Sequence, residues 1–263
     1  MTTQLLIYER AVPISKQRHN DWSVKAGKDY TFASHVNSVP LVAAEFQAAS
    51  AEYPIVFAGT EKAVMPSVIL GVREKENLYV SDNGLWDSRY VPAFIRRYPF
   101  VFASNDDGKT FTACIDEEYI GCNQQGLGER LFDSEGEQTQ YLGNVLEFLK
   151  AYQVQFQRTQ IFCNKLKELE LLEPMQAQFE PKAGGRVSLS GFMAVNREKL
   201  KKLNGDKLAE LARTDELELM YLHLQSMRNI SEIARRMGAK TAAEDQREAL
   251  EGTEGVEDIV TTH

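Results

Sequence analysis

The side chains best suited to bind a ligand gather between residues 86 and 98. Arginine offers a planar fork of donors that fits a carboxylate or a phosphate, and aromatic rings supply apolar walls beside it. The same residue types are enriched at protein–protein interfaces. A packed corner, with arginine stems lying over rings, is the structural alternative. The cluster consists of Trp86, Tyr90, Arg96, Arg97 and Tyr98.

The two arginines of this cluster are neighbours in residues 91–97, a segment that favours one or two helical turns. Neighbouring side chains on a helix diverge by about 100°. One arginine can therefore be structural while the other is exposed, and the sequence leaves open which is which.

His19 is the best candidate for acid–base chemistry. Its imidazole titrates near neutral pH, and Trp22 would place an aromatic wall beside it. A lone histidine is more often a hydrogen-bonded surface residue, and the tryptophan a half-buried anchor. We expect these structural roles and keep the catalytic role as the alternative.

Acidic side chains surround a glycine-rich segment, residues 117–140. Paired carboxylates can perform acid–base work or hold a hard cation. The spacing of an EF-hand is absent, and so is the GxxxxGK[ST] pattern of a phosphate-binding loop. A solvated surface loop is the favoured interpretation. The acidic residues are Asp116, Glu117, Glu118, Asp133 and Glu135.

The other residues that could ligate a metal or attack a substrate are scattered. His35 and His223 are isolated, with no HExxH pattern. Ser188 and Ser190 do not form GxSxG, and their alternation indicates the exposed face of a strand. Cys163 lies in a helical apolar stripe, a setting that raises the pKa of a thiol. The sequence thus predicts no catalytic residue, no metal site and no cofactor.

Charge and composition exclude several classes of protein. The net charge is −8, from 30 basic and 38 acidic side chains, which disfavours nucleic-acid binding. No apolar run reaches the roughly 20 residues that cross a bilayer, and the first residues lack a secretion signal. The 3 cysteines show no CxxC spacing. We expect a soluble, cytoplasmic protein without membrane insertion.

The first half of the chain carries short strand signals separated by turns. A helix is expected at residues 41–51, where Pro40 suits the first turn. A hairpin is expected around residues 105–108, whose Asn and Gly are typical of tight turns. Short strands joined in this way favour an antiparallel sheet. The expected strands are residues 30–36, 53–58, 67–72, 76–80, 99–103 and 110–116.

The second half contains the strongest local pattern, an amphipathic helix at residues 139–172. We expect Pro174 to end this helix, residues 175–180 and 186–195 to form a hairpin, and disorder to follow Gly238. Further helices are expected at residues 197–203, 207–212 and 214–237, with Asn196 as a cap and Gly205 as a break.

Together these elements predict an α+β fold with a largely antiparallel sheet in the first half and a long helix, a small hairpin and further helices after it. The expected units are a strand-rich body (1–137), a helical half packed on it (138–237) and an acidic disordered tail (238–263).

The chain contains the motif YVPAFIRRYPF at residues 90–100 and the shorter motifs NSVPL at 37–41, YPIVF at 53–57, GFMAV at 191–195 and YLHLQS at 221–226. These motifs resemble the SapC-like family of bacterial proteins. The similarity spans residues 8–237. The resemblance implies a link with surface-layer loci and outer-membrane transport, and it brings no established reaction, cofactor or catalytic residue.

Two hypotheses of function follow. The favoured one is a non-catalytic binding or accessory protein that holds a protein partner at residues 86–98. The alternative is an enzyme or small-molecule binder in which Arg96 or Arg97 fixes an anionic ligand and His19 is the acid–base group. That alternative requires His19 to lie within hydrogen-bonding reach of a pocket that contains one of these arginines.

Overall fold

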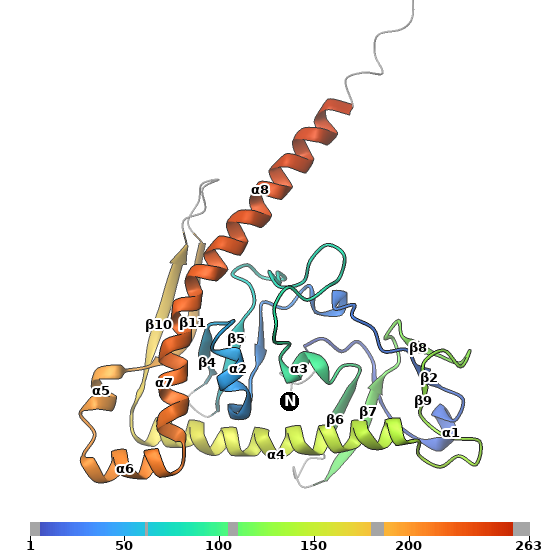
Figure 1. Ribbon diagram of the computed structural model, residues 1–263, viewed down its shortest axis with the longest axis horizontal. Helices are drawn as coiled ribbons and strands as arrows, with labels where there is room; N and C mark the ends of the chain where they lie inside the picture. Colours follow the sequence, from blue (N-terminus) through green and yellow to red (C-terminus); the bar gives the residue numbers. More distant parts are fainter. Residues whose placement is uncertain (1–5, 61–62, 105–109, 180–186, 255–263) are drawn as a thin grey trace, which may run out of the picture.

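The fold is α+β, as predicted, in a computed structural model that describes residues 6–60, 63–104, 110–179 and 187–254 (Figure 1). Within the last stretch, side chains are described as far as residue 242. Three antiparallel sheets are present among these residues, and one long helix, α4 (Gln140–Glu168), runs beneath the two larger ones.

The five-stranded sheet, called the larger sheet below, joins strands from both halves of the chain. Its order is β10 (Leu172–Phe179), β11 (Val187–Val195), β4 (Ile55–Gly59), β5 (Val64–Ile69) and β3 (Ser38–Pro40). The hairpin predicted at residues 175–180 and 186–195 is confirmed, although its turn lies outside the described residues. β11 pairs with β4, where Phe192 lies opposite Ala58. The late hairpin therefore completes the sheet that the first half begins.

The second sheet contains the other predicted hairpin. β6 (Phe100–Ser104) and β7 (Phe111–Asp116) pair as expected, and β1 (Ala11–Pro13) adds to the far edge of β7. The turn predicted at residues 105–108 lies outside the described residues. A third, small sheet with the order β8 (Cys122–Asn123), β2 (Ser23–Val24) and β9 (Glu129–Arg130) forms within and beside the glycine-rich segment.

Helix α4 holds the two larger sheets together. The Thr139 hydroxyl caps it by accepting a hydrogen bond from the backbone N–H of Leu142. Near its start, Leu142 and Leu149 pack in one core cluster with Phe100 and Ile115 of the second sheet. Near its end, a different set packs with the larger sheet: Phe162, Cys163 and Leu166, together with Phe57 and Val68.

The end of α4 differs from the expectation. The helix stops at Glu168, and Glu170 takes a left-handed backbone with φ 52° that turns the chain. Leu172 then begins β10, so Pro174 lies inside a strand and does not end the helix. β10 is an edge strand, paired only with β11 among the described strands, and an edge tolerates a residue without a backbone N–H.

The segments predicted as strands at residues 30–36 and 76–80 are not strands. Residues Thr31–Ala33 form a short 3-10 helix, η2, and residue Val80 makes a single bridge to Trp86. In each case a side chain closes a local turn: Asp29 accepts from the N–H of Thr31 at 2.9 Å, and Asn77 accepts from the N–H of Tyr79 at 2.9 Å. Such bonds compete with pairing in a sheet.

The remaining helices of the first half are short. They are α1 (Lys16–His19), η3 (Ala43–Glu45), α2 (Phe46–Ala49) and α3 (Ala93–Arg96). η3 and α2 together occupy the helix expected at 41–51, with Pro40 in β3 instead of the first turn.

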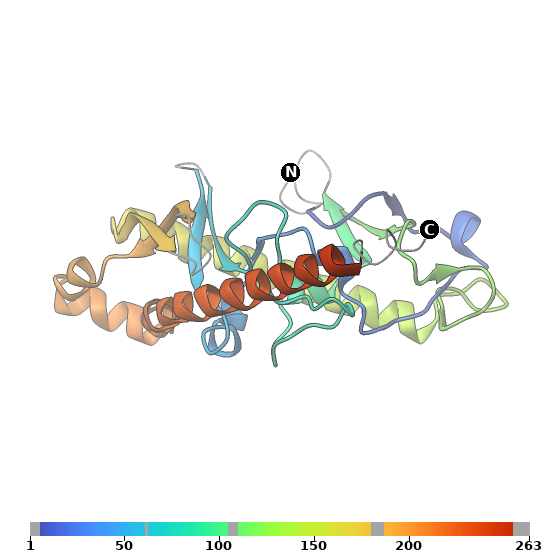
Figure 2. The same cartoon turned by 90° about the horizontal axis from the view of Figure 1, so that it is seen from above.

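The C-terminal helices largely follow the prediction. Asn196 caps α5 (Arg197–Lys201), whereas Gly205 begins α6 (Gly205–Arg213), because Asn204 caps that helix through the N–H of Lys207. α7 (Glu216–Ser226) and η4 (Met227–Asn229) lead into α8 (Ile230–Glu254). α8 extends clear of the sheets in Figure 1, and Figure 2 shows it from above. It continues past Gly238, where disorder was expected to begin, and residues 255–263 of the expected tail lie outside the described residues.

Candidate functional site

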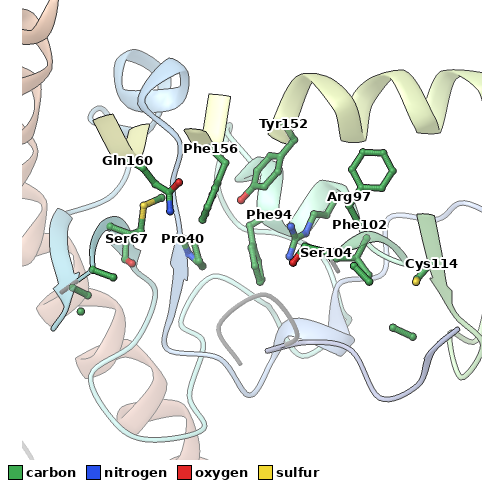
Figure 3. A pocket seen from close by; sticks show the side chains of 17 residues that line it. Pro40, Ser67, Phe94, Arg97, Phe102, Ser104, Cys114, Tyr152, Phe156 and Gln160 are labelled. Carbon is green, nitrogen blue, oxygen red and sulfur yellow. The ribbon is translucent and has the colours of Figure 1, made fainter. Parts of the chain in front are cut away.

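A pocket of about 480 Å³ lies between the two larger sheets, against the middle of α4 (Figure 3). One wall comes from the larger sheet, the other from the second sheet, and helices α3 and α4 contribute the residues between them. The lining consists of Pro40, Ala58, Gly59, Ala63, Met65 and Ser67 on one side, Ala11, Val101, Phe102, Ala103, Ser104 and Cys114 on the other, and Phe94, Arg97, Tyr152, Phe156 and Gln160 from the helices.

Arg97 is the buried cation of this pocket, with 4% of the residue exposed. Its guanidinium carbon lies 4.3 Å from the ring centre of Phe94, 5.1 Å from that of Tyr152 and 5.7 Å from that of Tyr8. Ring faces attract a cation and offset part of the cost of removing it from water. Burial raises the pKa of Tyr152 to about 12 and raises the pKa of Tyr8 as well, so both phenols stay neutral at physiological pH.

Glu45 fixes α3 and thereby the position of Arg97. Its Oε1 accepts hydrogen bonds from the backbone N–H of Ala93 and from the hydroxyl of Tyr90, both at 2.7 Å, and its Oε2 accepts from the N–H of Val42 at 3.0 Å. Burial and the adjacent carboxylate raise the pKa of Tyr90. Sequence reasoning missed Glu45, because an isolated glutamate beside a short apolar helix carries no signal of burial.

Arg96 lies on the other side of α3 and is exposed. Its Nε donates to the carbonyl of Val91 at 3.0 Å, and its guanidinium carbon lies 5.8 Å from the ring centre of Tyr90 and 5.5 Å from that of Phe148. It lines a second pocket of about 400 Å³ with Tyr98, and the backbone turn at α3 brings Arg97 to the edge of the same pocket. Arg97 thus contributes to the lining of both pockets, whereas Arg96 contributes only to that of the second.

Trp86 and Tyr98, separate in the sequence, are linked by rings that sequence reasoning missed. The ring of Tyr30 lies 5.6 Å from Trp86 and 6.1 Å from Phe32, and Phe32 stacks on Tyr98 at 4.1 Å. The Nε1–H of Trp86 donates to the hydroxyl of Tyr53 at 2.9 Å. All these rings except Tyr53 are partly buried, so the cluster is a packed aromatic seam that is partly accessible to solvent.

His19 is not brought to either arginine of the cluster. It is fully buried, its Nδ1 accepts from the N–H of Ser15 at 3.2 Å, and its Nε2 lies 3.2 Å from Oε1 of Glu117. Burial lowers the pKa of His19 despite the opposing charge of Glu117. Trp22 packs edge-on against the imidazole at 5.2 Å, and neither residue lines one of the two pockets.

Glu118, Asp133 and Glu135 of the acidic loop are exposed, as expected, but Asp116 and the carboxylate of Glu117 are not. Asp116 is fully buried and accepts from the backbone N–H groups of Glu9 at 2.8 Å and Arg10 at 3.0 Å, which ties the N-terminal segment to β7. The carboxylate of Glu117 is 5% exposed and pairs with Arg18. Hydrogen bonding to Arg18 lowers the pKa of Glu117. These carboxylates hold the chain together, which the local sequence pattern does not reveal.

The other candidate residues lie apart from both pockets. His35 is exposed, His223 is buried, and Ser188 and Ser190 alternate on the exposed face of β11 as predicted. Burial raises the pKa of Cys163 to about 12. Across the residues that the structure describes, no three His, Cys, Asp or Glu side chains gather in a way that could hold a metal ion. No helix in that part of the chain is long and apolar enough to cross a membrane.

The comparison with protein families agrees with the motifs. The family model described as SapC matches residues 14–233. The chain belongs to the SapC family. The SapC match includes Glu45, Arg96, Arg97 and the whole of α4, so the pocket lies almost entirely within it. No curated protein and no solved structure matches the chain.

Proposed function

We propose that the protein is a non-catalytic binding protein that holds a small anionic molecule beside Arg97. The observation that carries the proposal is a buried guanidinium at the side of a pocket whose walls are mostly apolar. Hydrogen bonds between a guanidinium and an anion are strong, and they strengthen further where water is excluded. A pocket of this kind, apolar with a single well-placed charge, is typical of a small-molecule site.

The groups in the pocket that could react favour binding over catalysis. Cys114 and Tyr152 are the thiol and phenol of the described lining, and burial raises the pKa of both. A protonated thiol and a protonated phenol are poor nucleophiles and poor bases at neutral pH. His19, the acid–base candidate, lies elsewhere against Glu117.

The experiment is native mass spectrometry of the protein purified from its own cells, with extraction and identification of small molecules that remain bound. Arg97→Met is the test variant, since methionine retains much of the stem without the charge. Arg96→Met is the matched control on the same helix. We expect an acid bound to the wild type and to Arg96→Met and lost from Arg97→Met. Equal retention in all three proteins, or no acid in any, would contradict the proposal.

A protein partner at the surface around Arg96, beside the aromatic seam, is the second candidate. It is favoured by Arg96, which lies exposed over the rings of Tyr90 and Phe148, a combination enriched at interfaces. In this proposal the chain is a cytoplasmic accessory protein that serves cell-surface or outer-membrane transport functions. Affinity capture should then lose a partner in Arg96→Ala and retain it in Arg97→Met. Loss in both variants, or in neither, would count against this surface.

A further inference from the structure

We infer that the molecule held beside Arg97 is a straight-chain monocarboxylic acid, with its carboxylate on the guanidinium and its aliphatic chain directed toward Ser67. The inference rests on the proposed function and specifies the ligand of the same pocket. It follows from the charge of the pocket, the nature of its walls and the arrangement of its residues.

The charge of the pocket fits a monoanion. Arg97 is the one charged side chain among the described residues that line it. A carboxylate fits the planar fork of donors that a guanidinium offers. A phosphate monoester would leave a further negative charge buried without a partner from the described lining, which is costly.

The walls beyond Arg97 fit a hydrocarbon chain. In the view of Figure 3, Phe94, Phe156 and Pro40 lie between Arg97 and Ser67. Carbon surfaces of this kind stabilise an aliphatic chain by removing it from water, and Met65 in the same wall can adapt to its shape. A sugar or a nucleoside would instead bury hydroxyl groups against Phe94, Phe156 and Pro40, whose side chains offer no hydrogen bond.

Polar side chains line the end of the pocket that lies away from Arg97. Ser67 from β5 and Gln160 from α4 lie at the end away from Arg97, and Gln160 is exposed. The volume of about 480 Å³ lies within the range of about 300–1,000 Å³ that is typical of small-ligand pockets. The apolar stretch between Arg97 and this end therefore suits an extended chain that runs toward Ser67 and ends before these polar groups.

The test is calorimetric titration of the full-length protein with butanoate, hexanoate, octanoate and decanoate, and with 1-octanol as the neutral match for octanoate. Each added CH₂ group that becomes buried should tighten binding by about four-fold. Arg97→Met should weaken octanoate binding by roughly 10- to 100-fold and leave 1-octanol unchanged, because the lost interaction is a charge-assisted hydrogen bond. Arg96→Met should change neither affinity.

Two further variants locate the ligand. Ser67→Leu fills the far end, so it should weaken decanoate binding while butanoate binding stays the same. Arg97→Lys keeps the charge without the planar fork and should bind octanoate with an affinity between those of the wild type and Arg97→Met. Thermal unfolding of each variant establishes that it is folded, and Arg97→Lys replaces Arg97→Met if the latter is not.

The outcomes separate the two proposals. Affinities that depend on Arg97 but not on chain length would overturn the straight-chain acid and leave the anion-binding function standing. Acids that bind with equal affinity to the wild type and to Arg97→Met would overturn both. Unchanged decanoate binding by Ser67→Leu would overturn the direction assigned to the chain.

Discussion

His223 should make the stability of the protein depend on pH in a way that one substitution removes. The side chain is fully buried between α7 and the larger sheet. Its Nδ1–H donates to the carbonyl of Ile55 at 2.8 Å, and its Nε2 accepts from the N–H of Val195 at 3.0 Å. This arrangement requires the neutral imidazole, because a proton on Nε2 would face another donor. Burial accordingly lowers the pKa of His223 from 6.5 to about 4.

The sign and size of the effect follow from these two pKa values. Above pH 6.5 the imidazole is neutral in the folded and the unfolded chain, and its contribution to stability is fully present. As the pH falls from 6.5 toward 4, the unfolded chain takes up the proton first, so the free energy of unfolding decreases. The decrease is about 2 kcal/mol between pH 7 and pH 5, and about 3 kcal/mol over the whole interval.

The assay is urea unfolding of the wild type and of His223→Gln at pH values from 7.5 to 5. Glutamine can donate to Ile55 and accept from Val195 without titrating. We expect the wild type to lose about 2 kcal/mol more than the variant over this range. His19, whose pKa burial also lowers, is present in both proteins and cancels from the difference. Equal losses in the two proteins would refute the assignment of the neutral imidazole to His223.

Three other predictions concern the fold and its thiols. Glu45→Gln should lower the free energy of unfolding by about 1–3 kcal/mol in urea, because one of the N–H or O–H donors around the carboxylate loses its acceptor; an unchanged value would contradict the role of Glu45. Leu166→Ala, at a fully buried site of α4, should cost about 2–5 kcal/mol, whereas Ile161→Ala, at a site 64% exposed on the same helix, should change stability by at most about 0.5 kcal/mol. Burial raises the pKa of Cys163 to about 12, so a maleimide at pH 7 should modify this thiol in urea but not in the folded protein, as measured by peptide mass spectrometry. Rapid modification of the folded protein would contradict the burial of this thiol.

The parts of the fold that the sequence predicts are those that depend on neighbours along the chain. The periodicity of α4 and the two hairpins are local patterns, and the structure has them within a few residues. The segment at residues 30–36 has the composition of a strand, yet its rings pack against Trp86 and Tyr98 and its backbone forms a turn closed by Asp29. Strand propensity reflects packing against a sheet surface, which the sequence does not specify.

The candidate site, too, is only partly predictable from the sequence. The RRY motif at residues 96–98 marks the residues of interest, but the burial of Arg97 depends on Glu45 and on rings from distant segments. The pocket walls are small residues such as Ala58 and Ala103 that have no signature of their own. Only the arrangement of two sheets on one helix makes them neighbours.

Because one helix lies beneath both larger sheets, a change in its length alters contacts with one sheet relative to the other. With 29 residues, α4 is about 43 Å long, and each residue advances the helix by about 1.5 Å and rotates it by about 100°. One residue gained or lost between Tyr152 and Phe162 would swing Phe162, Cys163 and Leu166 away from the larger sheet while Leu142 and Leu149 stayed in place. An insertion or deletion of one residue in this interval should therefore destabilise the protein and change how the two pocket walls are placed relative to each other.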